Sequence, residues 1–212
     1  MEANLQRHFT TDLAKYGEQG RVKVYFATEN KKKYAELEFL GRGAFELLQH
    51  PLEIPEIQGT MPEIIASKLE SARQQSTAFP IIVDDTGFEI DALKGFPGPY
   101  IKHFLDRFNC TGIVKLVDKI DPALRTARAV CSLGYLESAE SEPIYAFGYC
   151  DGEIHDRTDG EYKGFGFDPI FFPFPDKAFS DLSVEEKGNV SHRAHALVLL
   201  MDKIRASQAS SN

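Results

Sequence analysis

The sequence predicts an α/β (α+β) fold, in which strands and helices alternate before a long hairpin of two strands. Three observations carry this prediction. Val22, Val24 and Phe26 recur at every second position, which is the pattern of a half-buried strand. The apolar run at 81–83 is typical of a short buried strand in a sheet core. Two alternating runs, at 127–135 and 145–149, flank a polar turn and indicate an antiparallel hairpin.

The first strand leads into a helix whose apolar face includes Leu37, and Thr28 or Asn30 can cap its start. Lysines occupy positions 31, 32 and 33, in the first helical turn. Cations there oppose the helix dipole, unless an anion lies over the free N–H groups. The lysines therefore indicate either a solvated basic face or a phosphate site, and their place directly after a strand favours phosphate.

A second helix follows an extended segment at 51–59 that contains Glu56. Thr60 and Glu63 have the spacing of a capping box, and the helix behind them carries Lys68 near its first turns. After the central strand, alternation at 88–92 predicts a further strand. The prolines and glycines of 95–100 predict a stiff loop that is neither helix nor sheet ladder. Two helices are then expected before residue 121.

Two adjacent carboxylates, Asp84 and Asp85, directly follow the central strand. Because successive strand side chains face opposite ways, the two are expected to point in different directions. A carboxylate at a strand end can hold Mg²⁺, orient a water molecule or accept a proton. The alternative is a solvated strand end or a turn cap. The pattern does not fix which of the two faces a ligand. If it is Asp85, an Asp84→Asn change should have a much smaller effect than Asp85→Asn.

The C-terminal part begins with a stretch at 160–176 that is crowded with Gly, Phe and Pro. So many aromatic residues in a loop indicate either a wall of core or a stacking platform for a ring. Ser183 and Glu186 form another capping box, on a short helix that leads to Lys187. Residues 191–193 open the last helix, and the composition from residue 207 predicts disorder.

Length and composition restrict the class of protein. The 212 residues are divided into an N-terminal tail (1–20), one domain (21–206) and a disordered C-terminal tail (207–212). The net charge of −8 argues against binding to nucleic acid, and no apolar stretch approaches the ~20 residues that span a bilayer. Three widely spaced cysteines and the absence of a signal-peptide pattern predict a cytoplasmic protein without disulfide bonds.

The polar residues at the ends of these elements divide into three chemical groups. Carboxylates suit a metal ion, cations suit a polyphosphate, and the aromatic loop suits a base, which is the division of labour that nucleotide chemistry requires. The set is Thr28, Asn30, Lys33, Glu56, Lys68, Asp84, Asp85, 165–168, Lys187, His192 and Arg193.

With these residues the chain resembles the inosine triphosphate pyrophosphatases, over about 22–204. The matching segments are 26–33, 52–59, 83–87, 96–102, 165–169 and 191–193. The resemblance implies hydrolysis of inosine, deoxyinosine and xanthosine triphosphates (ITP, dITP, XTP) to monophosphate and pyrophosphate. It also implies Mg²⁺, for which Mn²⁺ can substitute, and a homodimer. The implied fold is a long mixed sheet flanked by helices, with two lobes around a deep nucleotide cleft.

The resemblance also implies roles for particular residues. Asp85 is expected to be the general base or a metal ligand, and Glu56 the second metal carboxylate. The phosphate-binding positions are Thr28, Asn30, Lys33 and Lys68. Glu29, Lys31, Lys32 and Thr86 are also expected to contact the substrate. Residues around the base are Phe165, Gly166, Phe167 and Asp168, with Phe165 stacking, and Lys187, His192 and Arg193 read the 6-oxo group. Glu29 and Phe167 depart from the family pattern, which has a small residue and a Trp or Tyr there.

Two other functions stay open from the sequence. One is a pyrophosphatase with a different base preference, for example for modified pyrimidine nucleotides. The other is a nucleotide-binding sensor without turnover, against which the retained Glu56, Asp85 and Lys33 argue. Release of pyrophosphate from a panel of triphosphates separates the three.

Overall fold

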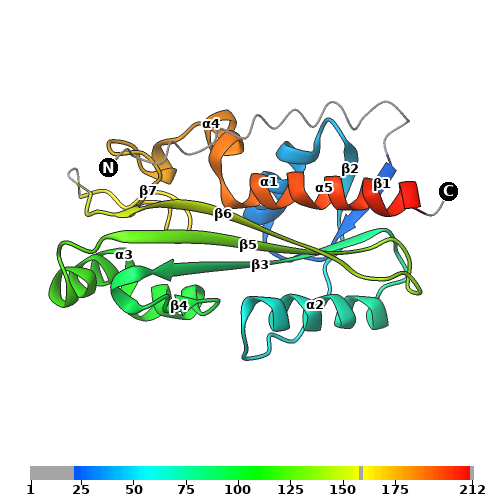
Figure 1. The fold of residues 1–212 in the computed structure, drawn as a ribbon, viewed down its shortest axis with the longest axis horizontal. Coiled ribbons are helices and arrows are strands. Elements are labelled where there is room, and N and C mark those ends of the chain that lie inside the picture. The colour runs from blue at the N-terminus through cyan, green and yellow to red at the C-terminus, as the bar shows by residue number, and fades with distance from the viewer. Residues whose placement is uncertain (1–21, 158–159, 211–212) are drawn as a thin grey trace.

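A seven-stranded mixed sheet runs through the molecule (Figure 1). The computed structural model describes residues 22–157 and 160–210. The strands are β1 (Val22–Phe26), β2 (Phe45–Gln49), β3 (Ile81–Ile90), β4 (Pro97–Gly98), β5 (Thr126–Leu136), β6 (Ile144–Ile154) and β7 (Phe171–Phe172). Their order is β2-β1-β3-β5-β6-β7, and β4 pairs with β3 outside this path. β1 is parallel to β2 and β3, and the other pairs are antiparallel. The predicted mixed sheet is confirmed.

Helices cover both faces of this sheet. They are α1 (Lys31–Gly41), α2 (Met61–Gln75), α3 (Ile101–Ile120), α4 (Val184–Val190) and α5 (His192–Ser210), with short 3-10 turns η2 (Asp91–Leu93) and η3 (Phe179–Asp181). α1 and α5 pack on one face through a buried apolar cluster, and α2 packs on the other through a second cluster. Figure 1 shows α5 and α2 on opposite sides of β5. None of the described helices is both long and apolar enough to cross a membrane.

Several predicted elements are confirmed. β1, α1 and the β5–β6 hairpin lie where the sequence patterns placed them. Asn30 is the cap of α1, because its side chain accepts hydrogen bonds from the backbone N–H groups of Lys32 and Lys33. Both predicted capping boxes, at Thr60 and at Ser183, are present.

The central strand is longer than predicted. β3 is one continuous strand of ten residues, paired with β5 from Ile81 opposite Leu136 to Ile90 opposite Ala127. The prediction of two strands with Asp84 and Asp85 at a strand end is therefore wrong. The strand that ends here is β1, whose last partner in β3 is Ile82. The polar residues interrupt the apolar pattern, but pairing with β5 carries the backbone through them.

Two further differences concern short strands. β2 was not predicted, because five residues joined to α1 by a brief turn give little periodicity. The segment at 95–100 was predicted to lie outside any ladder, yet Pro97 and Gly98 pair with Glu89 and Phe88 of β3. A two-residue strand at a sheet edge tolerates proline, because few of its N–H groups are needed.

The sequence predicted a tail at each end of the chain. Residues 1–20 lie outside the described residues. α5 extends to Ser210, so residues 207–210 are helical, whereas their composition predicted disorder from residue 207. Extending an existing packed helix adds one hydrogen bond per residue and avoids the cost of nucleation.

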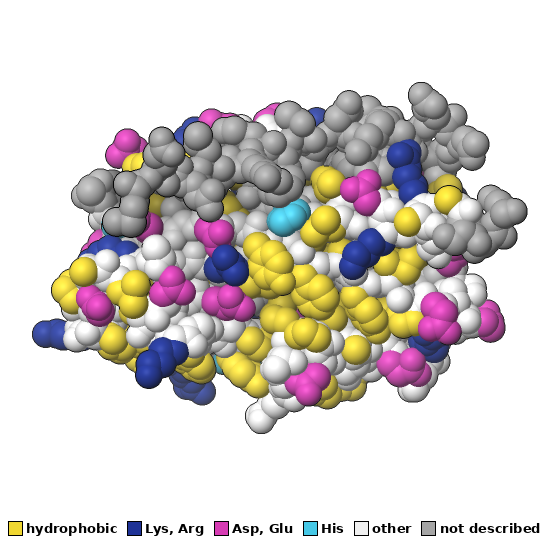
Figure 2. All heavy atoms as spheres, in the orientation of Figure 1, with side chains coloured by type: hydrophobic (Ala, Val, Ile, Leu, Met, Phe, Trp, Pro, Cys, Tyr) yellow, Lys and Arg dark blue, Asp and Glu magenta, His cyan; other side chains and the backbone are white. Residues whose placement is uncertain are grey.

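Strand β6 presents different chemistry on its two faces. Ala146 and Cys150 are buried on the side of α5, while Tyr145, Phe147 and Tyr149 are partly or fully exposed on the other. Figure 2 shows apolar side chains gathered in the middle of this view, in the region of the β5–β6 hairpin in Figure 1.

Candidate functional site

Strand β3 directs its two adjacent carboxylates to opposite faces of the sheet. Asp84 lies two residues after Ile82 and therefore on the same face of the strand; Ile82 belongs to the cluster packed against α1 and α5. Asp85 lies two residues after Val83, on the opposite face; Val83 belongs to the cluster packed against α2. Both side chains are buried although they are charged residues. The predicted alternation is confirmed, and it creates two separate groups of ionic contacts.

On the α1 and α5 face, Asp84 joins two cations. Lys33 Nζ lies 3.0 Å from Asp84 Oδ2, and Arg193 Nη2 lies 3.3 Å from the same oxygen. Burial alone would raise the pKa of Asp84, but the charges of Lys33 and Arg193 outweigh it and lower the pKa. Asp84 is therefore held ionised. Its separation from Arg193 in the sequence is 109 residues, so this contact ties the central strand to the last helix.

Arg193 makes further contacts at this position. Its Nη2 donates to Thr86 Oγ1 at 3.1 Å, and its Nη1 pairs with Glu36 of α1. Glu36 was not predicted as a site residue. It lies three positions after Lys33, on the same side of α1, and that helical spacing is the signal that could have found it.

On the α2 face, Lys68 joins two carboxylates. Its Nζ lies 2.5 Å from Asp85 Oδ1 and 3.4 Å from Glu56 Oε1, and it also donates to the backbone oxygen of Asp84. Burial raises the pKa of Asp85, and Lys68 and Lys33 offset this only in part. For Glu56, burial is outweighed by Lys68 and Lys102, and the pKa is lowered.

The two neighbouring aspartates thus have pKa values displaced in opposite directions. A carboxylate with a raised pKa is a stronger base, and one with a lowered pKa is a fixed charge. Asp85 has the character of a general base, and Asp84 has that of a structural anion.

The predicted phosphate-binding residues lie at the junction of β1 and α1. Thr28 is buried and its Oγ1 accepts a hydrogen bond from the N–H of Asn30. Asn30 caps α1, so its side-chain oxygen already has donors. Glu29, Lys31 and Lys32 are exposed. The structure therefore brings Lys33 and Thr28 next to β3, and leaves those three at the surface.

The aromatic loop divides into an exposed and a buried part. Phe165 is exposed, with Lys32 Nζ 5.1 Å from the centre of its ring. Phe167 is buried and stacks on Phe88, with ring centres 4.2 Å apart. Phe167 is thus part of the core, and Phe165 is the ring available for stacking. Gly166 between them has φ of 59°, a left-handed conformation that favours glycine.

The residues predicted to contact the base come together at the start of α5. Lys187 Nζ lies 2.7 Å from Asp168 Oδ2. His192 is buried beside Phe179, with parallel rings 6.0 Å apart. Burial, then the positive charge of Arg193, hold the pKa of His192 well below its usual value. His192 is therefore neutral.

His192 and Arg193 keep unused hydrogen-bonding groups. Within the described part of the chain, neither ring nitrogen of His192 nor Nε of Arg193 has a partner, although all three atoms are buried. A buried polar group without a partner costs about 1–3 kcal/mol. Such groups in a polar site are what a ligand with complementary acceptors and donors would satisfy.

The donors at Glu56 and Asp85 fit a magnesium ion. Both are carboxylates, and both approach one point, the ammonium group of Lys68. Among the described residues there is no group of three or more His, Cys, Asp or Glu side chains that could hold a metal. Mg²⁺ is commonly bound by one or two carboxylates together with substrate phosphates. The residues therefore suit an ion that a triphosphate helps to bind.

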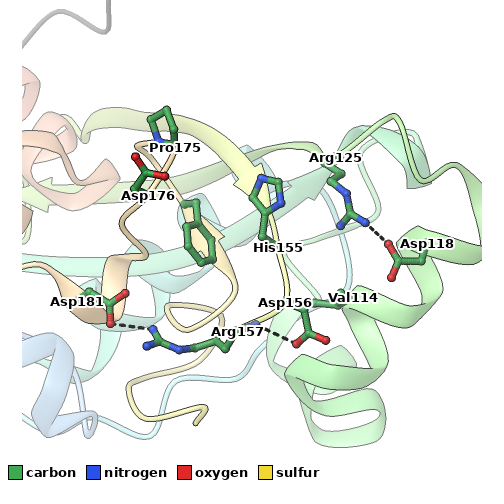
Figure 3. A pocket seen from close by; sticks show the side chains of 10 residues that line it. Val114, Asp118, Arg125, His155, Asp156, Arg157, Pro175, Asp176 and Asp181 are labelled. Carbon is green, nitrogen blue, oxygen red and sulfur yellow. Dashed lines mark hydrogen bonds and ion pairs between the residues drawn. The ribbon is translucent and has the colours of Figure 1, made fainter. Parts of the chain in front are cut away.

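A cavity of about 600 Å³ opens elsewhere, between α3, the end of β6 and β7 (Figure 3). None of the predicted site residues lines it. Four aspartates and two arginines do, and the arginines are paired with Asp118 and Asp181. This excess of negative charge does not suit a triphosphate.

Asp84 between Lys33 and Arg193, and Asp85 beside Lys68, form a charged site next to the end of the parallel strand β1. Proteins of the α/β class commonly bind phosphorylated ligands at such a place. The comparison with known families is more specific. The chain belongs to the Ham1 family, whose model matches residues 24–203.

Similar proteins agree with this assignment. The chain is 37% identical over 179 residues to an inosine triphosphate pyrophosphatase of Aspergillus fumigatus, covering 84% of this chain and 92% of that protein. It is 39% identical over 178 residues to a dITP/XTP pyrophosphatase of Methanopyrus kandleri, covering 83% and 93%. The structure of a HAM1 protein from Coxiella burnetii has a TM-score of 0.72 at 27% identity, covering 87% of this chain and 99% of that one.

Proposed function

We propose that this protein hydrolyses non-standard purine nucleoside triphosphates (ITP, dITP and XTP) to the monophosphate and pyrophosphate. The observation that carries the proposal is Asp85, a buried carboxylate with a raised pKa, held by Lys68 beside Glu56. The names of the similar proteins, inosine triphosphate pyrophosphatase and dITP/XTP pyrophosphatase, support this substrate class.

The reaction needs a water molecule that is deprotonated as it attacks the α-phosphorus. Asp85 accepts that proton, because burial has made it more basic than an exposed aspartate. Lys68 holds the carboxylate through Oδ1, which leaves Oδ2 to face the water. The bond between the α-phosphorus and the oxygen that bridges to the β-phosphorus breaks, and pyrophosphate leaves.

The other charged residues neutralise the phosphates. Lys33 and Lys68 are the buried or partly buried lysines nearest to the aspartates, and they offer positive charge to the triphosphate. Glu56 and Asp85 would hold Mg²⁺, which supplies further neutralisation of charge on the phosphates. Phosphoryl transfer depends mainly on such positioning and charge stabilisation.

Selection of the base rests on donors at the start of α5. Hypoxanthine and xanthine present an acceptor at position 6, where adenine presents an amine. Arg193 and Lys187 are donors, and a donor that faces an amine would stay unpaired, at a cost of about 1–3 kcal/mol per group. Neutral His192 can donate from one ring nitrogen and accept at the other.

The experiment that tests the function is pyrophosphate release from ITP, dITP, XTP, GTP, ATP and a modified pyrimidine triphosphate. We expect turnover of the first three and little of the rest. Turnover of the pyrimidine alone would support a different base preference, and binding without turnover would support a sensor. Exhaustive chelation should abolish the activity and Mg²⁺ should restore it; unchanged turnover after chelation would contradict the metal assignment.

We also propose that the protein is cytoplasmic. All three cysteines are free thiols in the structure, and Cys131 and Cys150 are buried. Free thiols persist where the compartment is reducing. Fractionation of cells that express the protein at its natural level tests this placement.

A further inference from the structure

We infer that Tyr100 is a positioning residue, whose hydroxyl group holds the segment that carries Glu56 in place beside Asp85. The inference rests on the proposed function, since Glu56 matters only if the α2 face is the hydrolytic one. Tyr100 belongs to the segment at 96–102, one of the segments in which the chain resembles the family.

The segment at 51–59 has few constraints of its own. No backbone-to-backbone hydrogen bond involves these residues within the described chain. Pro51 and Pro55 have no N–H group to donate. Most of the segment is exposed, and the side chain of Glu56 has 55% of its surface accessible. The only salt bridge of Glu56 in the described part of the chain is with Lys68, at 3.4 Å.

Two side chains hold the backbone of this segment from outside. Gln75 Nε2 donates to the backbone oxygen of Glu53 at 3.1 Å. At the other end, the hydroxyl of Tyr100 accepts a hydrogen bond from the N–H of Gly59 at 3.1 Å and donates to the oxygen of Gly59 at 3.4 Å. Glu56 lies between these two points, three residues before Gly59.

Tyr100 is itself fixed to the strand that carries Asp85. Its N–H donates to the oxygen of Pro97, and its own oxygen accepts from the N–H of Phe104 in α3. Gly98 pairs with Phe88 and Pro97 with Glu89, three and four residues beyond Asp85 in β3. These hydrogen bonds therefore join the backbone of Gly59 to β3 at Phe88 and Glu89, and the strand itself continues from there to Asp85. This connection sets where Glu56 lies relative to Asp85.

The direct test is a double-mutant cycle of Tyr100→Phe and Glu56→Gln. Tyr100→Phe keeps the ring and removes only the hydroxyl. We expect kcat for ITP to fall about tenfold, because the hydroxyl and its two hydrogen bonds to Gly59 are lost. KM should change little, because Lys33 and Arg193 still meet the substrate. If Tyr100 acts through Glu56, Tyr100→Phe should have no further effect in a Glu56→Gln protein. Additive losses, a kcat equal to wild type, or a loss confined to KM would overturn the inference.

A second measurement does not depend on activity. Amide hydrogen exchange of Gly59, whose N–H donates to the Tyr100 hydroxyl, should become faster in Tyr100→Phe, with an unchanged melting temperature. Tyr145→Phe, which removes a hydroxyl from the hairpin, serves as the matched control and should leave both kcat and this exchange unchanged. Equal exchange rates in wild type and Tyr100→Phe would show that Tyr100 does not hold the segment. If the wild-type protein releases no pyrophosphate, the proposed function fails, while the exchange result still decides whether Tyr100 holds the segment.

Discussion

At the scale of single residues, Asp84 and Asp85 show how position determines the behaviour of identical side chains. One lies between Lys33 and Arg193 and has a lowered pKa; the other lies against α2 and has a raised pKa. The sequence predicted that they face opposite ways. The strand pattern alone could not assign their roles, because the cations that distinguish them come from other parts of the chain.

Asp85→Asn should abolish turnover and leave nucleotide affinity nearly intact. The amide keeps the shape of the side chain but loses the charge and the basicity. Loss of a general base costs about 10²–10⁴ in rate. Steady-state hydrolysis of ITP and calorimetric binding of ITP measure the two effects. Retention of more than about a tenth of the rate, far above that range, would show that Asp85 is not the base.

Asp84→Asn should lower stability, while its effect on turnover is predicted to be much smaller than that of Asp85→Asn. Removing its charge leaves Lys33 and Arg193 buried without their shared anion, and breaking a buried ion pair costs about 3–5 kcal/mol. For Asp84→Asn, the free energy of unfolding measured in urea should fall by about this amount. Asp85→Asn should not have this cost. The pKa of Asp85 is raised, so burying its charge is unfavourable, and removing that charge offsets the loss of the ion pair with Lys68. The reverse order of stabilities would mean that the two environments are exchanged.

Arg193→Ala should change which base is accepted more than how fast phosphate is attacked. Its guanidinium lies on the α5 face, away from Lys68 and Glu56. We expect kcat/KM to fall for ITP by about 10- to 100-fold, equivalent to one lost charged hydrogen bond, and to stay nearly constant for ATP. Equal losses for both nucleotides would assign Arg193 to the phosphates.

His192 should make stability depend on pH in a mildly acidic range. Its pKa in the folded protein is far below the value of about 6.5 that it has when unfolded, so the unfolded chain binds the extra proton. The free energy of unfolding should therefore decline as pH falls below about 6.5, by up to about 1.4 kcal/mol per unit. Urea titrations between pH 7.5 and 5.5 measure this slope. It should flatten in His192→Gln and persist in His103→Gln, which alters an exposed histidine; the same slope in both variants would contradict the assignment.

At the scale of the element, α5 reaches the sheet because β6 has a glycine beneath it. A Cβ atom at Gly148 would lie 2.1 Å from the backbone nitrogen of Ala196 and 2.2 Å from the backbone oxygen of His192. These are backbone atoms of α5 and cannot move aside separately. The close approach places His192 and Arg193 against β3, and it is needed for their contacts.

Gly148→Ala should therefore displace the start of α5. Overpacking of this kind costs about 1–3 kcal/mol, and base selection should weaken with it. Gly134→Ala in β5 is the matched control, because the atoms that it would meet are side-chain ends of Val83 and Leu69, at 3.0 and 3.2 Å. Melting temperature and the ITP to ATP ratio of kcat/KM measure both variants. A Gly148→Ala protein as stable and selective as Gly134→Ala would contradict this account.

Elements with strong local patterns were predictable, and those defined by distant partners were not. The capping boxes, α1 and the hairpin follow from spacing within a few residues. The continuity of β3 through Asp84 and Asp85 depends on β5, about fifty residues away, and the strand at Pro97 depends on β3. Tyr100 was missed for the same reason, since its contact with Gly59 spans 41 residues of sequence. Glu36 was missed although its spacing from Lys33 on one helix is local.

At the scale of the whole molecule, we expect a homodimer. Large aromatic side chains are exposed on the segment 95–108 (Phe96 and Phe108) and on the β5–β6 hairpin (Tyr149). A second subunit would cover them. Burial of such a surface stabilises association. Sedimentation at micromolar concentration should give twice the mass of one chain, and Tyr149→Glu should weaken the association. A monomer in the wild type would contradict the prediction.

The placement of Asp84 and Asp85 on opposite faces of β3 also bears on how this protein could change over evolutionary time. The residues proposed to receive the base come from α4 and α5, and those proposed to act on the phosphates come from β3, α2 and the segment before α2. Substitutions on one layer leave the side chains of the other layer untouched. Substitutions on one side of the sheet could thus change which bases are accepted, while the residues proposed to hydrolyse the phosphate chain, on the other side, are inherited unchanged.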